Sequence, residues 1–311
     1  MVNVVFTGLY SENCVLPPQE KVNLIRSCGI ENIYWVVWKG YVDYKVADYG
    51  VKIIEIEEPY PHVSSSIRGR QRQIFNTEAA LKNFSDDDIV FKLRWDVDIN
   101  KEILENIQKK NFFNKIENGI IDNKVWVGFY AIHELFSPSD LSFAGYKKDL
   151  DTLVNFEYTI NNHSANNYVC HDGMMLSPKF IENNKRVSDL LYREKPDPWA
   201  PGFKESHYDN EDYLYAWAYN FYVFWKYFKT GPLGSCYFKR GDVYRWPTAI
   251  VDYDKFSYNF DTMCGRASKL GPHPRYRVYD DIFVNRLIRG EYEDPFANKL
   301  YNIIQSNLNE W

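Results

Sequence analysis

The chain has 311 residues, which is enough for one large domain or two closely packed ones. Hydrophobic residues make up 45% and charged residues 25%, so disorder is excluded as the main state. The net charge of -5 argues against a general nucleic-acid-binding protein, which carries an excess of Lys and Arg. Aromatic residues reach 17%, and their rings either fill the core or line a cleft for bases and sugars.

Three further features bear on the compartment. The five cysteines form no C-x-x-C pair, which favours reduced thiols over a disulfide framework or a zinc site. The start, MVNVVFTGLY, has no basic region followed by an apolar one, so no secretory signal is expected. The most apolar stretch, residues 214–225, is too short to span a bilayer. We therefore expect a cytoplasmic protein without a membrane span.

The first 110 residues alternate strand and helix patterns. Strands are predicted at residues 2–8, 32–38 and 51–58 from their β-branched and aromatic content. Helices are predicted at residues 17–29, which end at a glycine, and at residues 64–84, whose apolar positions recur at helical spacing. This alternation predicts an α/β fold with a mostly parallel central sheet flanked by helices.

Residues 89–96 then change to a period of two. Alternate side chains point to opposite faces of the predicted strand. One face carries Ile89, Phe91, Leu93 and Trp95, and the other carries Val90, Lys92, Arg94 and Asp96. Ionisable groups on a buried strand are costly unless they are paired or bind a metal. Either this strand meets solvent or its end holds a charged ligand. Asn100 is expected to cap a following helix over residues 101–110.

The later part of the chain is more mixed. A strand is predicted at residues 124–132, a helix from about Lys148, and an amphipathic helix at residues 298–308. The aromatic stretch over residues 209–228 predicts a buried core helix, with an interfacial membrane helix as the alternative. No linker is evident. We expect a unit over residues 1–230 and a helical or irregular C-terminal elaboration over residues 231–311, packed on it as one compact body.

Several common catalytic motifs are absent. The sequence contains no G-x-G-x-x-G after the first strand, no G-x-x-x-x-G-K-[ST], no G-x-S-x-G and no H-E-x-x-H. Dinucleotide-binding, P-loop, serine-hydrolase and zinc-protease functions therefore lose their main support. The chemistry is expected to come from carboxylates, Arg and Lys.

The segment FKLRWDVD places two carboxylates where a strand ends. Asp96 and Asp98 follow the predicted strand at one end, where open α/β sheets bind ligands. Two carboxylates one residue apart can share Mg2+ or Mn2+ with phosphate oxygens, and Lys92 and Arg94 would add positive charge. In the alternative, these residues have a purely structural role: Asp98 lies at the start of a helix, and Arg94 forms an ion pair with Asp96.

The run IRGRQRQIFNTEAALKNFSDDDIVFKLRWDVDI resembles the core of the WavE-type glycosyltransferases of bacterial lipopolysaccharide and capsule synthesis. Residues 134–150 and 209–217 resemble two later segments of that family, in the same order. The resemblance implies a GT-A-like catalytic domain over residues 1–230 and a nucleotide-sugar donor. It also implies a glycan or lipid-linked glycan acceptor, such as lipopolysaccharide, lipooligosaccharide or capsule. Lys92, Arg94 and Asp96 carry over from its K-x-R-x-D strand, whereas Asp98 is not a firm position of the family, so the resemblance leaves metal dependence open.

Other donor-binding candidates come from two places. Thr7, Gly8 and Tyr10 follow the first strand, where a nucleoside usually lies, although a plain turn explains them as well. Arg68 and Arg72 share one face of a predicted helix and would meet a diphosphate, with a solvated charged face as the alternative. Gln73 belongs to the family-like segment.

An inverting transfer needs a carboxylate that takes the proton of the acceptor hydroxyl. The candidates are Asp140, Asp172 and Glu211, and Asp212 lies beside Glu211. In the alternative explanation, Asp172 belongs to a turn, and Glu211 and Asp212 are the negative charges at the start of a helix. A basic segment near residues 266–277 would face an anionic acceptor or lipid headgroups at the inner membrane, or plain solvent.

Two other functions compete with sugar transfer. They are a metal-dependent nucleotidyl- or phosphotransferase and a non-catalytic carbohydrate-binding protein.

Overall fold

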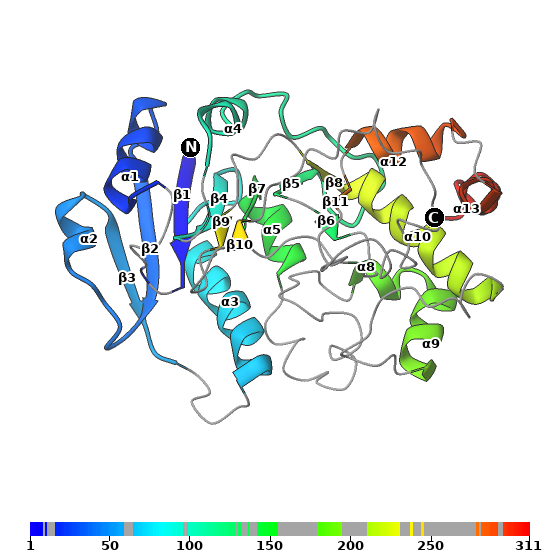
Figure 1. Ribbon diagram of the computed structural model, residues 1–311, viewed down its shortest axis with the longest axis horizontal. Helices are drawn as coiled ribbons and strands as arrows, with labels where there is room; N and C mark the ends of the chain where they lie inside the picture. The colour runs from blue at the N-terminus through cyan, green and yellow to red at the C-terminus, as the bar shows by residue number, and fades with distance from the viewer. Residues whose placement is uncertain are drawn as a thin grey trace.

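A computed structural model describes residues 1–8, 10, 16–58, 65–95, 97, 99–128, 130–131, 136, 142–154, 179–194, 210–230, 237–238, 244–245, 278–279, 281–291 and 295–311. The described part is an α/β structure built on a seven-stranded sheet with flanking helices. Figure 1 shows strands β1 to β3 with helices α1 and α2 on one side of the molecule and helices α9, α10 and α13 on the other.

The strands run in the order β3-β2-β1-β4-β7-β5-β8. Their bounds are β1 (Val2–Thr7), β2 (Asn32–Trp38), β3 (Lys52–Ile56), β4 (Ile89–Arg94), β5 (Val125–Val127), β7 (Ser142–Tyr146) and β8 (Phe228–Lys229). Two short ribbons pair β6 (Tyr130–Ala131) with β11 (Val278–Tyr279), and β9 (Tyr237–Phe238) with β10 (Tyr244–Arg245).

The sheet is mixed, which corrects the expectation of a mostly parallel one. Strands β1 to β4 pair in parallel, as do β5 and β8, but β7 is antiparallel to both β4 and β5. The segment SFAGY, just before the helix predicted from about Lys148, was not predicted as a strand. Its Ala and Gly weaken strand propensity, and it forms a strand because burial between two neighbours outweighs that preference.

The helices follow the predicted pattern in the first half of the chain. They are α1 (Pro18–Ser27), α2 (Lys45–Asp48), α3 (Ser65–Leu81), α4 (Lys101–Asn106), α5 (Lys147–Leu153), α8 (Lys179–Glu182), α9 (Lys185–Glu194), α10 (Glu211–Tyr227), α12 (Asp281–Ile288) and α13 (Pro295–Asn307). Asn100 caps α4 as predicted, because its side-chain oxygen accepts a hydrogen bond from the backbone N–H of Ile103 at 3.0 Å.

Two hydrophobic clusters cover the two faces of the sheet. On one face, β4 packs Phe91 and Leu93 against α1 and α4. On the other face, Val90 belongs to a cluster that includes α3, α5, α10 and α13. This division confirms the predicted alternation along β4. Lys92 is nevertheless only 1% exposed, so its strand does not meet solvent there.

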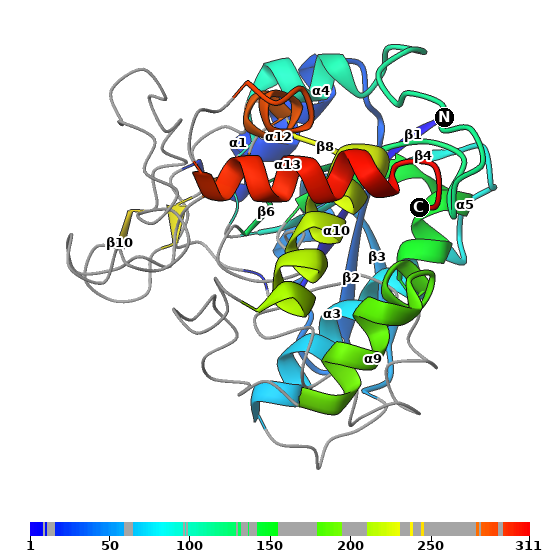
Figure 2. The same ribbon diagram turned by 90° about the vertical axis from the view of Figure 1, so that its right-hand side faces the viewer.

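Helix α10 is buried around most of its circumference, as the core-helix interpretation predicted. Helices α9, α12 and α13 pack on it, and Figure 2 shows α13 lying across it. Trp311 donates its indole N–H to the Tyr215 hydroxyl at 2.8 Å and also contacts the rings of Tyr219 and Tyr222. The end of the chain therefore packs on the same core as the sheet. No helix in the described ranges is long and apolar enough to cross a membrane.

A buried carboxylate, Asp149, fixes the chain that leads into β5. It is 2% exposed and accepts hydrogen bonds from the Asp122 backbone N–H at 2.8 Å and the Asn123 side-chain amide at 2.9 Å. Burial raises the pKa of Asp149 above its ordinary value of 3.8, despite these two hydrogen bonds. The folded protein then binds more protons at this group than the unfolded chain does. Stability should therefore fall as pH rises from about 3.8 through the raised pKa.

We predict that Asp149→Ala lowers the free energy of unfolding by about 1–3 kcal/mol, because it leaves two buried donors without an acceptor. Asp149→Asn keeps one acceptor oxygen and cannot ionise. Urea unfolding of wild type and Asp149→Asn should show a difference in stability that is larger at pH 4 than at pH 7. An equal difference at both pH values would contradict the assigned burial effect.

Candidate functional site

The carboxyl ends of β1 and β4 form the candidate site. The order β3-β2-β1-β4 makes β1 the point where the chain switches from adding strands on one side to adding them on the other. Open α/β sheets bind ligands in the crevice at such a point. Thr7 and Arg94 are direct partners across this pair of strands, so the predicted donor-binding segments meet here.

Thr7, Gly8 and Gln73 form the first part of the site. The buried Thr7 hydroxyl lies 3.2 Å from Gln73 Oε1 and 3.4 Å from the carbonyl oxygen of Leu93. Gly8 has a φ of +86°, a left-handed conformation that favours glycine. A Cβ at Gly8 would lie 3.8 Å from Gln73 Nε2. Helix α3 thus presents Gln73 to the turn that follows β1.

An aromatic cluster holds this turn from the other face of the sheet. The Trp35 indole N–H donates to the Gly8 carbonyl at 2.9 Å. Trp95 stacks on Phe6 with ring centroids 3.8 Å apart, and the half-buried ring of Tyr10 meets Trp95 at 5.6 Å. The backbone of β1 and the end of β4 are therefore fixed by packed rings, and Tyr10 is the member of this cluster that is partly accessible.

Three cationic side chains lie on or beside β4, on two different faces of the sheet. Lys92 is buried with its ammonium 5.5 Å from the centre of the Phe143 ring, and the half-buried Arg94 follows two residues later on the same face. Lys21, near the start of α1, is fully buried and donates to the carbonyl of Trp95. Arg94 is the only one of the three that is partly exposed, and a guanidinium group at a strand end favours an anionic ligand such as a phosphate.

The predicted metal ligands Asp96 and Asp98 lie outside the described residues, so the ligand set itself has no described geometry. Among the described residues, no group of three His, Cys, Asp or Glu side chains could hold a metal ion. The nearby described oxygens of Thr7 and Gln73 are engaged with each other. The assignment of Asp96 and Asp98 as metal ligands stays a prediction. Asn100, not Asp98, caps α4, which weakens the helix-start explanation of Asp98.

The remaining predicted residues are not brought to this edge by any described contact. Arg68 and Arg72 belong to α3, but their side chains are outside the described part of the structure. Asp140 and Asp172 also lie outside the described residues. The structure therefore bears on donor binding more directly than on the choice of a general base.

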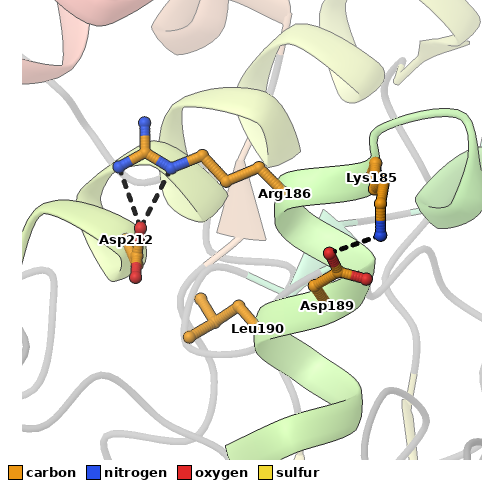
Figure 3. A pocket seen from close by; sticks show the side chains of 5 residues that line it. All are labelled: Lys185, Arg186, Asp189, Leu190 and Asp212. Carbon is orange, nitrogen blue, oxygen red and sulfur yellow. Dashed lines mark hydrogen bonds and ion pairs between the residues drawn. The ribbon is translucent and has the colours of Figure 1, made fainter.

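Glu211 is exposed at the first residue of α10, after Asn210, whose side chain caps that helix. A shallow pocket beside it is lined by Lys185, Arg186, Asp189, Leu190 and Asp212 (Figure 3). Arg186 bonds Asp212 at 2.9 Å and lies 4.3 Å from the centre of the Tyr215 ring. Figure 1 shows α9 and α10 on the other side of the molecule from β1, which favours a helix-start role for this acidic pair.

Two contributors to the site, Lys21 and Trp35, escaped the prediction from sequence. Lys21 carried a signal, because it shares the buried face of α1 with Ile25, four residues on, where an apolar residue is expected. Trp35 sits within an apolar strand, and nothing local separates its indole contact with Gly8 from ordinary core packing. No model of a known protein family matches the chain, and no curated protein is significantly similar to it in sequence.

Proposed function

We propose that this protein is a GT-A-like glycosyltransferase that moves a sugar from a nucleotide-sugar donor to a bacterial surface glycan. The acceptor would be a lipid-linked or growing chain of lipopolysaccharide, lipooligosaccharide or capsule, met from the cytoplasm at the inner membrane. The observation that carries the proposal is the meeting of Thr7, Gly8 and Gln73 at the carboxyl end of β1, where Thr7 is the direct neighbour of Arg94 in β4.

Each described residue has a distinct task in this proposal. The Gly8 turn and the accessible edge of Tyr10 receive the nucleoside, with a base stacking on the phenol ring. Thr7 and Gln73 orient it through polar atoms held by β1 and α3. Arg94, supported by the buried charge of Lys92, offsets the negative charge of the diphosphate.

During transfer, the bond between the sugar's anomeric carbon and the donor phosphate breaks, and the acceptor oxygen bonds to that carbon. The electron pair leaves with the nucleotide, whose growing charge the cationic edge stabilises. In an inverting enzyme the acceptor's proton passes to a carboxylate, for which Asp140, Asp172 and Glu211 are the candidates. A Mn2+ or Mg2+ ion held by Asp96 and Asp98 would neutralise the same phosphate charge.

The proposal is tested by a thermal-shift screen of nucleotide sugars with and without Mn2+, followed by product analysis. We expect one nucleotide class to raise the melting temperature, because a ligand that binds the native state stabilises it. Turnover should release a nucleoside diphosphate or monophosphate. Release of pyrophosphate would indicate a nucleotidyltransferase instead. No response to any nucleotide in the presence of Mn2+ would overturn the proposal.

A further inference from the structure

Two segments that are far apart in the sequence lie side by side and carry an excess of lysine. Residues 106–124 connect α4 to β5, and residues 225–229 span the end of α10 and β8. Together they contain two carboxylates and a larger set of lysines, which we call the basic surface: Lys109, Lys110, Lys115, Lys124, Lys226 and Lys229. This local excess of positive charge contrasts with the net charge of -5 on the whole chain.

Contacts between the two segments hold the basic surface together. The ammonium of Lys124 donates to the carbonyl of Trp225 and lies 5.8 Å from the centre of the Trp225 ring. In the other direction, the ammonium of Lys229 donates to the Phe112 carbonyl at 2.8 Å and lies 4.1 Å from the centre of that ring. A carbonyl oxygen and an aromatic ring carry no net charge. These contacts therefore fix the two lysines in place without neutralising them.

The carboxylates of the two segments do not balance this charge. Asp122 pairs with Lys148 of α5 at 2.8 Å, outside the basic surface, and the other carboxylate is the exposed Glu117. No carboxylate in the described part of the chain forms an ion pair with the exposed members of the surface, which are Lys109, Lys110 and Lys115. An anionic partner would therefore meet accessible positive charge here.

The basic surface lies at the opposite edge of the sheet from the candidate site. Strand β7 is antiparallel to both β4 and β5, so β5 runs in the same direction as β4 and begins at the same edge. Lys124 comes directly before β5, whereas the candidate site is at the carboxyl ends of β1 and β4. Figure 1 shows α4 and the chain that follows it at the end of the sheet where the N-terminus lies. A partner on this surface would leave the candidate site open.

We propose that the basic surface docks the protein on anionic phospholipid headgroups, with the candidate site facing away from the membrane. Each lysine close to a negatively charged leaflet adds to binding, and aromatic side chains beside such lysines are typical of proteins that lie on a membrane. Trp225 and Phe112 are half-buried among these lysines and supply that aromatic component. A nucleic acid fits less well, because a nucleic-acid-binding domain carries a basic excess overall.

This inference goes beyond the proposed function and does not depend on it, since docking requires no particular substrate. Under the proposed function, docking at this edge has one consequence for the acceptor. The donor site would meet the growing end of a lipid-linked glycan rather than the sugars next to the lipid.

Co-sedimentation with vesicles tests the proposal, using phosphatidylcholine alone and equal parts of phosphatidylcholine and phosphatidylglycerol. Wild type should bind the second kind and not the first, and added NaCl should weaken binding because salt screens exposed charges. Lys110→Glu/Lys115→Glu should lower the affinity at least about tenfold. The matched control is Lys45→Glu/Lys82→Glu, which makes the same change of net charge at exposed lysines near α2 and α3 and should bind as wild type.

Equal binding by the two double variants, or no binding of wild type to the anionic vesicles, would overturn the inference. Hydrogen–deuterium exchange on the vesicles should slow in residues 106–124 and 225–229. Slowing confined to residues 266–277 would assign docking to that other basic segment instead. Tighter binding to a single-stranded oligonucleotide than to the vesicles, lost in Lys110→Glu/Lys115→Glu, would identify the surface as a nucleic-acid site and also overturn the inference.

The thermal response to nucleotides separates this inference from the proposed function. It is measured in solution without vesicles, where Lys110→Glu/Lys115→Glu should respond as wild type because the basic surface and the candidate site are at opposite edges of the sheet. Vesicle binding without any nucleotide response in wild type would support the basic surface and overturn the proposed function. A nucleotide response without vesicle binding would do the reverse.

Discussion

Asp96→Asn is expected to lower kcat/KM for sugar transfer by at least about 100-fold, the usual cost of removing one group that stabilises transition-state charge. Asp96 follows a β4 end that is held by Trp95 and Lys21. Asp98→Asn should cause a comparable loss that is partly relieved by raising the Mn2+ concentration, because Asp98 is a metal ligand in the proposed function.

The measurement is steady-state turnover across a Mn2+ titration, with Asp87→Asn as the control. Asp87 is an exposed carboxylate just before β4, at the opposite end of the strand from Asp96. Asp87→Asn should behave as wild type. Full activity in Asp96→Asn would exclude a role for the Asp96 carboxylate in transfer. A loss in Asp98→Asn that does not respond to Mn2+ would leave Asp98 without a metal role.

The second large effect concerns stability. Trp95→Ala should lower the free energy of unfolding by about 3–5 kcal/mol, because it removes a buried ring from contacts with three other aromatic side chains. Those contacts are the stack on Phe6 and the edge contacts with Trp35 at 6.1 Å and Tyr10 at 5.6 Å. The end of β4 would also lose one of its two anchors, so any nucleotide response should disappear with it.

Trp95→Phe separates the ring packing from the indole N–H. The Trp95 Nε1 atom is buried and has no hydrogen-bond partner within the described part of the chain. Phenylalanine keeps a ring over Phe6 and removes that donor, so we expect a much smaller loss than for alanine. Chemical unfolding of both variants measures how much free energy of unfolding each one loses relative to wild type. A similar loss in Trp95→Phe and Trp95→Ala would contradict the assigned role of the stack on Phe6.

Local patterns predicted the strands and helices of the first half well, because their periodicities are strong. Strand β2 has the predicted bounds, β1 and β4 differ from prediction by a residue or two, and the faces of β4 are those that alternation indicated. The predicted strand over residues 124–132 instead divides into β5 and β6, which belong to different sheets. Gly128 lies between them, where strand propensity is weakest.

The candidate site was predictable to the extent that it follows from strand topology. Residues after β1 and at the end of β4 meet because neighbouring parallel strands share one edge, and this places Thr7 opposite Arg94. Lys21 and Trp35 depend on packing between segments far apart in sequence, which no local pattern specifies. Glu211 looked equally suited to catalysis and to a helix start, and only its location beside α9 favours the second.

The most direct test of the central claim is hydrogen–deuterium exchange of the wild-type protein with and without UDP, GDP, ADP or CMP in the presence of Mn2+. We predict slower exchange in peptides that cover residues 5–10, 73–77 and 92–98 when a nucleotide binds, because these segments meet at the carboxyl ends of β1 and β4. Protection confined to α9 and the start of α10, or no protection with any of the four nucleotides, would contradict the account.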